Sequence, residues 1–359
     1  GKVDRRALPE PDFTSKSVDR TPSTEAERIL CGVFADVLGL ERVGVEDSFF
    51  ELGGDSISSM QVAARARREG ISLTPRLVFE HRTPGRLAVL ADDAPAPSST
   101  VDSGVGEIPW TPVMRALGDD ALRPGFAQAR VVVTPAGLDL DALTKALQAV
   151  LDTHDLLRLR AESGGRLVVA APGAVDAAGL VTRVSAGAED IGELTEHEAR
   201  TAAGTLDPSA GIVARLVWVD AGNAGQGRLV FVAHHLAVDA VSWGILLPDL
   251  RAAYDEAVAG GSPALEPVTT SYRRWAGRLI EQASNEETVA ELDRWVALLE
   301  DAKPVLEPRA GQSHSWSATL SGPAARALVS RLPGAFHCGV REVLLAGLAG
   351  AVDGGAGML

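Results

Sequence analysis

The stretch VEDSFFELGGDSISSM, Val45–Met60, places two adjacent glycines directly before a segment with helical spacing. Gly53 and Gly54 can adopt backbone angles that other residues rarely reach, so they can turn a loop sharply into a helix. Asp55 or Ser56 would then cap that helix, with the Ser56 hydroxyl at its positive end. A phosphodiester on that hydroxyl would lie near free backbone N–H groups. On these residues alone, a turn followed by a helix cap is the simpler interpretation.

The flanking sequence predicts a small all-α helical bundle. Thr24 and Glu27 have the capping-box spacing, and apolar residues follow at a helical period as far as Leu38. A second helix is expected over Ser56–Glu69 and a short third one over Pro84–Leu90. Segments rich in Pro, Ser and Thr bound this unit on both sides, and we interpret them as linkers at residues 13–21 and 92–107.

Composition and charge exclude several classes of protein. The chain has 359 residues, 46% of them hydrophobic and 23% charged, which is typical of a modular soluble protein. Its net charge of −14, from 34 Lys and Arg against 48 Asp and Glu, disfavours binding to nucleic acid or an anionic membrane. No apolar run could span a bilayer. Two cysteines, Cys31 and Cys338, provide neither a disulfide framework nor a cysteine-based zinc site, so a cytoplasmic protein without a bound metal is expected.

The larger region after the second linker mixes strands and helices, which is typical of an α/β layered domain. Its expected strands are Ala129–Thr134, Ile212–Val219 and Leu229–Val232, its expected helices Leu140–Leu151 and Val241–Val258, and its expected hairpin connection Gly222–Gly227.

Adjacent histidines follow one of these strands in the string HHLAVDAVSW, His234–Trp243. Neighbouring side chains in an extended chain point to opposite faces, so only one of the two histidines can face a given cavity. A histidine pair on its own is more often structural than catalytic. A zinc site is weakly supported because no His-x-x-x-His or Cys-x-x-Cys spacing is present. A Ser-His-Asp hydrolase is also weakly supported because the sequence lacks a Gly-x-Ser-x-Gly elbow.

The first motif closely resembles the modification site of peptidyl carrier proteins in nonribosomal peptide synthetases. FADVLGL at Phe34–Leu40 resembles the first helix of that family, and the resemblance covers residues 22–91. It implies that Ser56 carries a covalent 4′-phosphopantetheine whose thiol holds an amino acid or peptide, with Gly53, Gly54 and Asp55 forming the attachment loop. A phosphopantetheinyl transferase is the implied partner.

The N-terminal segment GKVDRRALP, Gly1–Pro9, resembles the last motif of an adenylation domain. The resemblance implies that residues 1–12 are the end of such a domain. An upstream adenylation domain is therefore an expected partner of the carrier.

The histidine string resembles the HHxxxDxxSW signature of epimerization domains, which belong to the condensation-domain superfamily. Condensation domains usually show glycine after the aspartate, whereas this chain has Ala240. Other segments resemble the same family, namely PWTPVM at 109–114, THDLLRLR at 153–160 and TSYRRWAGRL at 270–279. The resemblance implies a chloramphenicol-acetyltransferase-like α/β lobe over residues 108–300 and the start of a second lobe over 301–359. It assigns catalysis to His235 and a supporting motif to His234, Asp239, Ser242 and Trp243.

These resemblances predict a carrier that presents a thioester to an epimerase, which inverts the α-carbon from L to D before a downstream condensation domain. Inversion suits two acid–base groups on opposite faces of the carbon. In the family the second group is a glutamate in an EGHGRE-like motif, which this chain lacks, so the second lobe is expected to be incomplete and activity to require its remainder. The alternatives are an inactive partial domain that docks a trans-acting enzyme and, fitting the motif less well, peptide-bond condensation.

Overall fold

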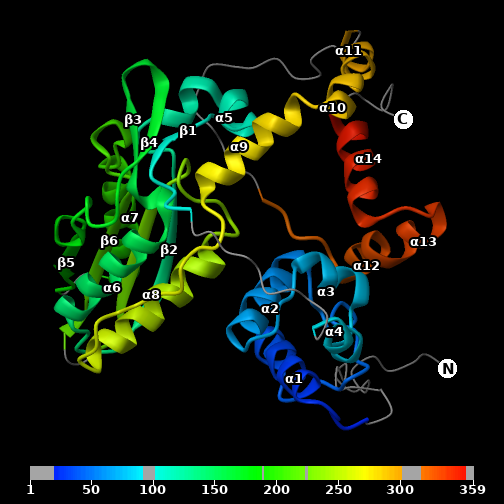
Figure 1. Cartoon of the computed structure of the whole chain (residues 1–359), viewed down its shortest axis with the longest axis horizontal. Helices are drawn as coiled ribbons and strands as arrows, with labels where there is room; N and C mark the ends of the chain where they lie inside the picture. Colours follow the sequence, from blue (N-terminus) through cyan, green and yellow to red (C-terminus); the bar gives the residue numbers. More distant parts are fainter. Residues whose placement is uncertain (1–19, 92–101, 188–189, 223–224, 301–316, 353–359) are drawn as a thin grey trace. The chain divides into compact units, whose positions relative to one another are not determined.

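The computed structural model describes residues 20–91, 102–187, 190–222, 225–300 and 317–352. The chain divides into two compact units, residues 1–281 and 282–359 (Figure 1). The parts are described separately below. The expected remnant at residues 1–12 lies outside the described residues, as do most of the first linker and most of the second.

The N-terminal part is a bundle of helices around an apolar core. Phe34, Phe49 and Leu87 are fully buried in this core. Its first helix ends at a left-handed Gly39 and begins with the expected capping box, in which Thr24 accepts from the Glu27 N–H. The helices are α1 Glu25–Leu38, α2 Ser56–Arg68, α3 Pro75–His81 and α4 Pro84–Ala91.

Helix α3 is not among the expected elements. It has only seven residues, too few for a periodic apolar pattern to stand out. Its start nevertheless carries a recognisable signal, because Thr74 caps the N–H of Leu77 and Pro75 occupies the first turn.

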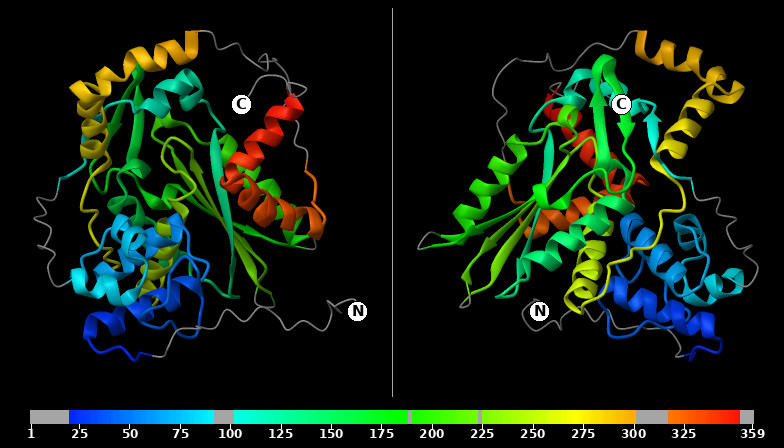
Figure 2. Two further views of the ribbon diagram at one scale, coloured as in Figure 1. Left: turned by 90° about the vertical axis from the view of Figure 1, so that its right-hand side faces the viewer. Right: turned by 60° about the vertical axis from the view of Figure 1, so that its left-hand side comes forward.

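A four-stranded sheet with helices on both faces forms the centre of the α/β part (Figure 2). Strands β5 and β6 are parallel, and the other neighbours are antiparallel. Helices α6 and α8 share a core with one face, and helix α7 packs on the other. In spatial order the strands are β2 Ala127–Thr134, β7 Gly227–His234, β6 Ala214–Asp220 and β5 Val181–Ser185; the helices are α6 Leu140–Thr153, α7 Ile191–Gly204 and α8 Trp243–Val258.

The expected strands and helices of this lobe are therefore present, and the expected β6–β7 connection joins antiparallel neighbours, although residues 223 and 224 lie outside the described part. A smaller antiparallel sheet was not expected from the sequence. Its strands are short, so alternation gives little signal. It contains β1 Gly106–Ile108, β4 Arg166–Val169 and β3 Leu159–Glu162, with helix α5 Pro112–Leu117 nearby in sequence. Short 3-10 turns are η1 Gly118–Leu122, η2 Asp155–Arg158, η3 Ser163–Gly165, η4 Ala177–Gly179 and η5 Pro208–Ala210.

The C-terminal part is helical in its described residues. The expected opening strand at Ser315–Leu320 is wrong for residues 317–320, because they pair with no strand; residues 315 and 316 are outside the described part. The single helix expected over Gly334–Val352 is interrupted at His337, whose φ of 51° is left-handed and ends the helix there. The elements are α9 Tyr272–Ala283, which crosses the unit boundary, α10 Glu286–Ala290, α11 Leu292–Glu300, α12 Gly322–Arg326, the π-helical turn η7 Ala327–Arg331, α13 Leu332–Phe336 and α14 Val340–Val352.

Candidate functional site

The expected attachment loop leads directly into helix α2, whose first residue is Ser56. Asp55 is the N-cap, so of the two expected capping residues it is the aspartate that caps. Its carboxylate accepts from the Ser58 N–H at 2.7 Å and from the Ser58 hydroxyl at 2.7 Å. The Asp55 N–H in turn donates to the Ser58 hydroxyl at 2.7 Å. These reciprocal bonds fix the direction in which the loop enters the helix.

The two glycines of this loop are required for different reasons. Gly53 has a φ of 98°, a left-handed conformation that L side chains rarely adopt. Gly54 lies against the fully buried Phe49, because a Cβ at position 54 would come within 2.4 Å of that ring. Its N–H also donates to the Phe49 carbonyl at 2.9 Å. The core phenylalanine therefore determines the path of the loop.

The local structure fits a covalent phosphopantetheine. A helix N-terminus attracts a phosphate group through its free N–H groups and its dipole. Nothing lies within 4 Å of the position a Cβ would take at Gly53, so the loop is open on that side. Residues 53–56 would hold the group, and no further geometry is needed to accept it.

The two adjacent histidines of the second motif lie in different environments. His234 is fully buried at the end of β7. Its Nε2 donates to the Arg123 carbonyl at 3.1 Å, and its Nδ1 accepts from the Leu236 N–H at 3.2 Å. Burial is the main cause that lowers the pKa of this imidazole. With both nitrogens bonded and no exposed surface, His234 is a neutral structural residue.

His235 instead lies on the wall of a cavity of about 670 Å³. Its ring stacks on Phe126 with centroids 4.9 Å apart. Its Nδ1 lies 2.8 Å from the Val238 carbonyl, and its Nε2 lies 3.0 Å from the Gln128 side-chain nitrogen. The cavity is mainly apolar, since its other lining residues are Val113, Met114, Leu117, Ala121, Leu156, Leu236, Ala237, Asp239, Ser242, Tyr272 and Trp275.

The remaining residues of the motif organise the turn before helix α8. Asp239 accepts from the Ser242 N–H at 2.8 Å and from its hydroxyl at 2.7 Å. Desolvation acts to raise the pKa of Asp239, but these hydrogen bonds outweigh it and the pKa is lowered. Trp243 is buried, packs edge-to-face on Phe231 and donates its indole N–H to Gln128 Oε1 at 2.7 Å.

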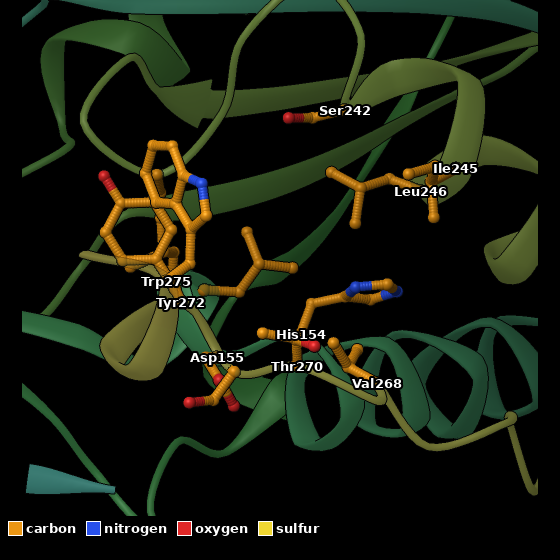
Figure 3. A pocket seen from close by; sticks show the side chains of 13 residues that line it. His154, Asp155, Ser242, Ile245, Leu246, Val268, Thr270, Tyr272 and Trp275 are labelled. Carbon is orange, nitrogen blue, oxygen red and sulfur yellow. The ribbon is translucent and has the colours of Figure 1, made fainter. Parts of the chain in front are cut away.

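A second cavity, of about 280 Å³, lies next to the first and shares Ser242, Tyr272 and Trp275 with it. Figure 3 shows the rings of Tyr272 and Trp275 on one side of it and His154 on the other. The His154 Nε2 lies 2.9 Å from an Asp249 carboxylate oxygen. His154 belongs to the THDLLRLR segment, in which Arg158 is also buried and bonds three backbone carbonyls, so this segment has a structural role.

Three contributors to the site were not recognised in the sequence: Phe126 and Gln128 from β2 and its approach, and Tyr272 at the start of α9. Phe126 and Gln128 are two residues apart, the spacing at which side chains of an extended chain share a face. A polar residue at the start of an otherwise apolar strand was the available signal. Its partner could not be inferred, because Gln128 and His235 are 107 positions apart.

Metal sites and membrane spans are both absent from the described residues. No group of three or more His, Cys, Asp or Glu side chains in this part of the chain could hold a metal ion. None of the helices in the same ranges is both long and apolar enough to cross a membrane.

Two family profiles match the chain. The phosphopantetheine attachment site profile matches residues 28–90, which include the α2 loop, and the condensation domain profile matches residues 123–321, which include both histidines. The first match indicates a covalently attached 4′-phosphopantetheine.

The sequence relatives belong to peptide synthetases. A linear gramicidin synthase from Brevibacillus parabrevis contains a chain that is 35% identical over 98% of this one, and surfactin synthase subunit 1 of Bacillus subtilis is 31% identical over 96%. The present chain spans only 7% and 10% of these two proteins.

Solved structures share the fold of the α/β part. The epimerization domain of the third module of tyrocidine synthetase B superposes with a TM-score of 0.57 at 23% identity, over 70% of this chain and 60% of that one. The first condensation domain of the calcium-dependent antibiotic synthetase gives 0.53 at 19% identity, over 73% and 63%. The fold is therefore the condensation-type α/β fold, as expected. The chain belongs to the condensation-domain family and combines such a domain with a preceding phosphopantetheine carrier, as part of the nonribosomal peptide synthetases.

Proposed function

We propose that this chain carries an aminoacyl or peptidyl thioester on Ser56 and epimerizes its α-carbon at His235. The observation that carries the proposal is the different placement of the two histidines. His234 is buried with both nitrogens bonded, whereas His235 lies on the wall of an apolar cavity. The alanine at position 240, where condensation domains usually have glycine, favours epimerization over condensation.

The phosphopantetheine would supply a thiol, and a thioester of that thiol makes the neighbouring α-proton more acidic. His235 would then take this proton on Nε2, while the electron pair of the broken C–H bond moves toward the carbonyl. A second acid returns a proton to the opposite face of the carbon, which gives the inverted centre. The apolar walls of the cavity exclude water and so favour this transfer.

The division of labour along the chain is part of the proposal. Residues 1–12 would end an adenylation domain, 22–91 would form the carrier, 108–300 the first lobe and 301–359 the start of a second. The adenylation domain would supply the amino acid, a phosphopantetheinyl transferase would modify Ser56, and a downstream condensation domain would receive the product.

The test is α-proton exchange in heavy water. A phosphopantetheinyl transferase and a small panel of L-aminoacyl coenzyme A thioesters would load the chain without an adenylation domain. Mass spectrometry of the released amino acid would measure deuterium at the α-carbon. The His235→Ala variant should lose at least about 100-fold in exchange rate, because general-base catalysis contributes that much or more. His197→Ala, at an exposed position in α7, is the matched control and should exchange like the parent.

The two possible failures have different meanings. Equal exchange in the parent and in His235→Ala would remove His235 from the mechanism. No exchange in the parent, together with normal loading of Ser56, would contradict epimerization by this chain and favour the alternative of a docking platform.

Peptide-bond condensation is a second candidate, favoured by the match of the condensation domain profile to residues 123–321. It requires an acceptor amine, so it predicts a new peptide when the loaded chain is mixed with an aminoacyl carrier. A peptide product without α-proton exchange would decide for this candidate.

A further inference from the structure

We propose that Gln128 is a positioning residue that presents His235 as a neutral base, with the proton on Nδ1 and the lone pair on Nε2. The inference rests on the proposed function of His235 and adds a residue to that site. It follows from a chain of three hydrogen bonds that runs from Trp243 through Gln128 and His235 to the Val238 carbonyl.

The first bond determines the orientation of the Gln128 amide. An indole N–H can only donate, so the atom that Trp243 contacts at 2.7 Å must be the amide oxygen. Trp243 is itself buried and packed edge-to-face on Phe231, with the Arg130 guanidinium over its ring at 5.4 Å. The amide therefore cannot exchange its two ends without leaving an indole N–H facing an NH₂ group.

The second and third bonds then determine the tautomer of His235. The Gln128 NH₂ group can only donate, so Nε2 of His235 at 3.0 Å must accept with its lone pair. The Val238 carbonyl can only accept, so Nδ1 at 2.8 Å must carry the proton. Both ring nitrogens give the same answer. His234 has the opposite tautomer, with its proton on Nε2.

The arrangement suits a base that must remain unprotonated until the substrate arrives. A protonated His235 would point its Nε2–H at the Gln128 NH₂ group, which is two donors facing each other. An incoming α-C–H would replace the amide at the lone pair, and Phe126 would hold the ring plane meanwhile. Asp239 and Tyr272 are the other titratable side chains that line this cavity among the described residues.

Replacing the amide by a carboxylate distinguishes positioning from mere packing. Gln128→Glu has nearly the same shape but offers only acceptors, so the oxygen that faces Nε2 would favour the doubly protonated imidazolium. Gln128→Leu removes the hydrogen bonds without adding a charge. Gln226→Glu, on an exposed residue of the β6–β7 connection, adds the same charge elsewhere and is the matched control.

The measurement is NMR of the full chain labelled with ¹⁵N-histidine, with His235→Ala used to assign the signals. In the parent, His235 should show one protonated and one unprotonated nitrogen, with the proton on Nδ1. In Gln128→Glu at pH 7, both nitrogens should be protonated. In the exchange assay, Gln128→Glu should lose about 100-fold and Gln128→Leu about five- to tenfold.

The spectra separate this inference from the proposed function. A parent His235 protonated on Nε2, or a Gln128→Glu variant in which His235 stays neutral, would overturn the role of Gln128 even if exchange proceeds. Gln128→Glu exchanging faster than Gln128→Leu would overturn it as well. The expected spectra in a chain without exchange would support Gln128 as positioning residue while contradicting epimerization.

Discussion

The two candidate sites are built around the same four-residue turn. In Asp55–Ser58 and in Asp239–Ser242, the aspartate accepts from the serine N–H and hydroxyl, and the aspartate N–H donates back to that hydroxyl. Both turns lead into a helix, α2 and α8 respectively. The local device is therefore the same in a carrier and in a condensation-type lobe.

The two sites differ in where the functional residue lies relative to that turn. Ser56 lies inside its turn, so five consecutive residues describe its setting. His235 lies four residues before its turn, and its orientation comes from Phe126 and Gln128, more than 100 positions away in sequence. The comparison suggests that local sequence determines the first site and tertiary packing determines the second.

The largest expected effect separates the two serines of the first turn. Ser56→Ala should abolish addition of phosphopantetheine, because the hydroxyl is the proposed point of attachment. Ser58→Ala removes only the reciprocal cap bonds and should still be modified. Mass spectrometry of the intact chain after treatment with transferase and coenzyme A measures both. Modification of Ser56→Ala would show that the attachment site lies elsewhere.

The second prediction concerns the acid sensitivity of the carrier's first helix. The buried Glu27 accepts from the Ser23 N–H at 2.6 Å, from the Ser23 hydroxyl and from Arg20, which lowers its pKa to about 2 despite desolvation. A carboxyl whose pKa is lower in the folded state stabilises that state above its unfolded pKa, near 4.5, and the contribution disappears as pH falls toward 2. The full contribution is about 3 kcal/mol.

Glu27→Gln should therefore destabilise the carrier by about 2–3 kcal/mol at pH 7 and by much less near pH 2. Hydrogen exchange of the peptide covering residues 20–38, in parent and variant at the same pH, measures the difference. Tryptophan fluorescence is the internal control, because residues 22–91 contain no tryptophan and the rest of the chain has all six. A difference that persists unchanged in acid would contradict the role of the carboxylate.

The same distinction explains how far the sequence could predict the molecule. The α1 capping box, the start of α2 at Ser56 and the strands β2, β6 and β7 are marked by residues within a few positions of each other. The three-stranded β1-β4-β3 sheet was missed because its strands are too short to show alternation. For the histidine site the sequence indicated one face per histidine, but the Gln128 contact depends on the pairing of β2 with β7.

The third prediction compares the two glycines of the attachment loop. Gly54→Ala should destabilise the carrier by about 1–3 kcal/mol, since the new methyl group would overlap the Phe49 ring. Gly53→Ala meets no atom within 4 Å and should cost only the strain of a left-handed backbone, about 1 kcal/mol. Hydrogen exchange of the peptide covering residues 45–60 ranks the two. A more severe effect at Gly53 would mean that Phe49 does not determine the path of the loop.

The smallest expected effects come from the two aspartates, and they test whether the equivalent turns have equivalent roles. Asp55→Ala should destabilise the carrier by about 1 kcal/mol, which is the usual effect of losing an N-cap. Asp239→Ala should cost about 0.5–1 kcal/mol, because Asp239 is exposed and its partner Ser242 can bond water instead. Hydrogen exchange of the peptides that span each turn gives both values.

The functional readouts should diverge more than the stabilities. Asp55→Ala should slow modification of Ser56, since the cap fixes the helix end on which that residue lies. Asp239→Ala should leave the ¹⁵N pattern of His235 as in the parent, because the tautomer depends on Gln128 and on the Val238 carbonyl. A changed tautomer in Asp239→Ala would show that the local turn, and not the long-range contact, orients the base, and the contrast between the two sites would then be lost.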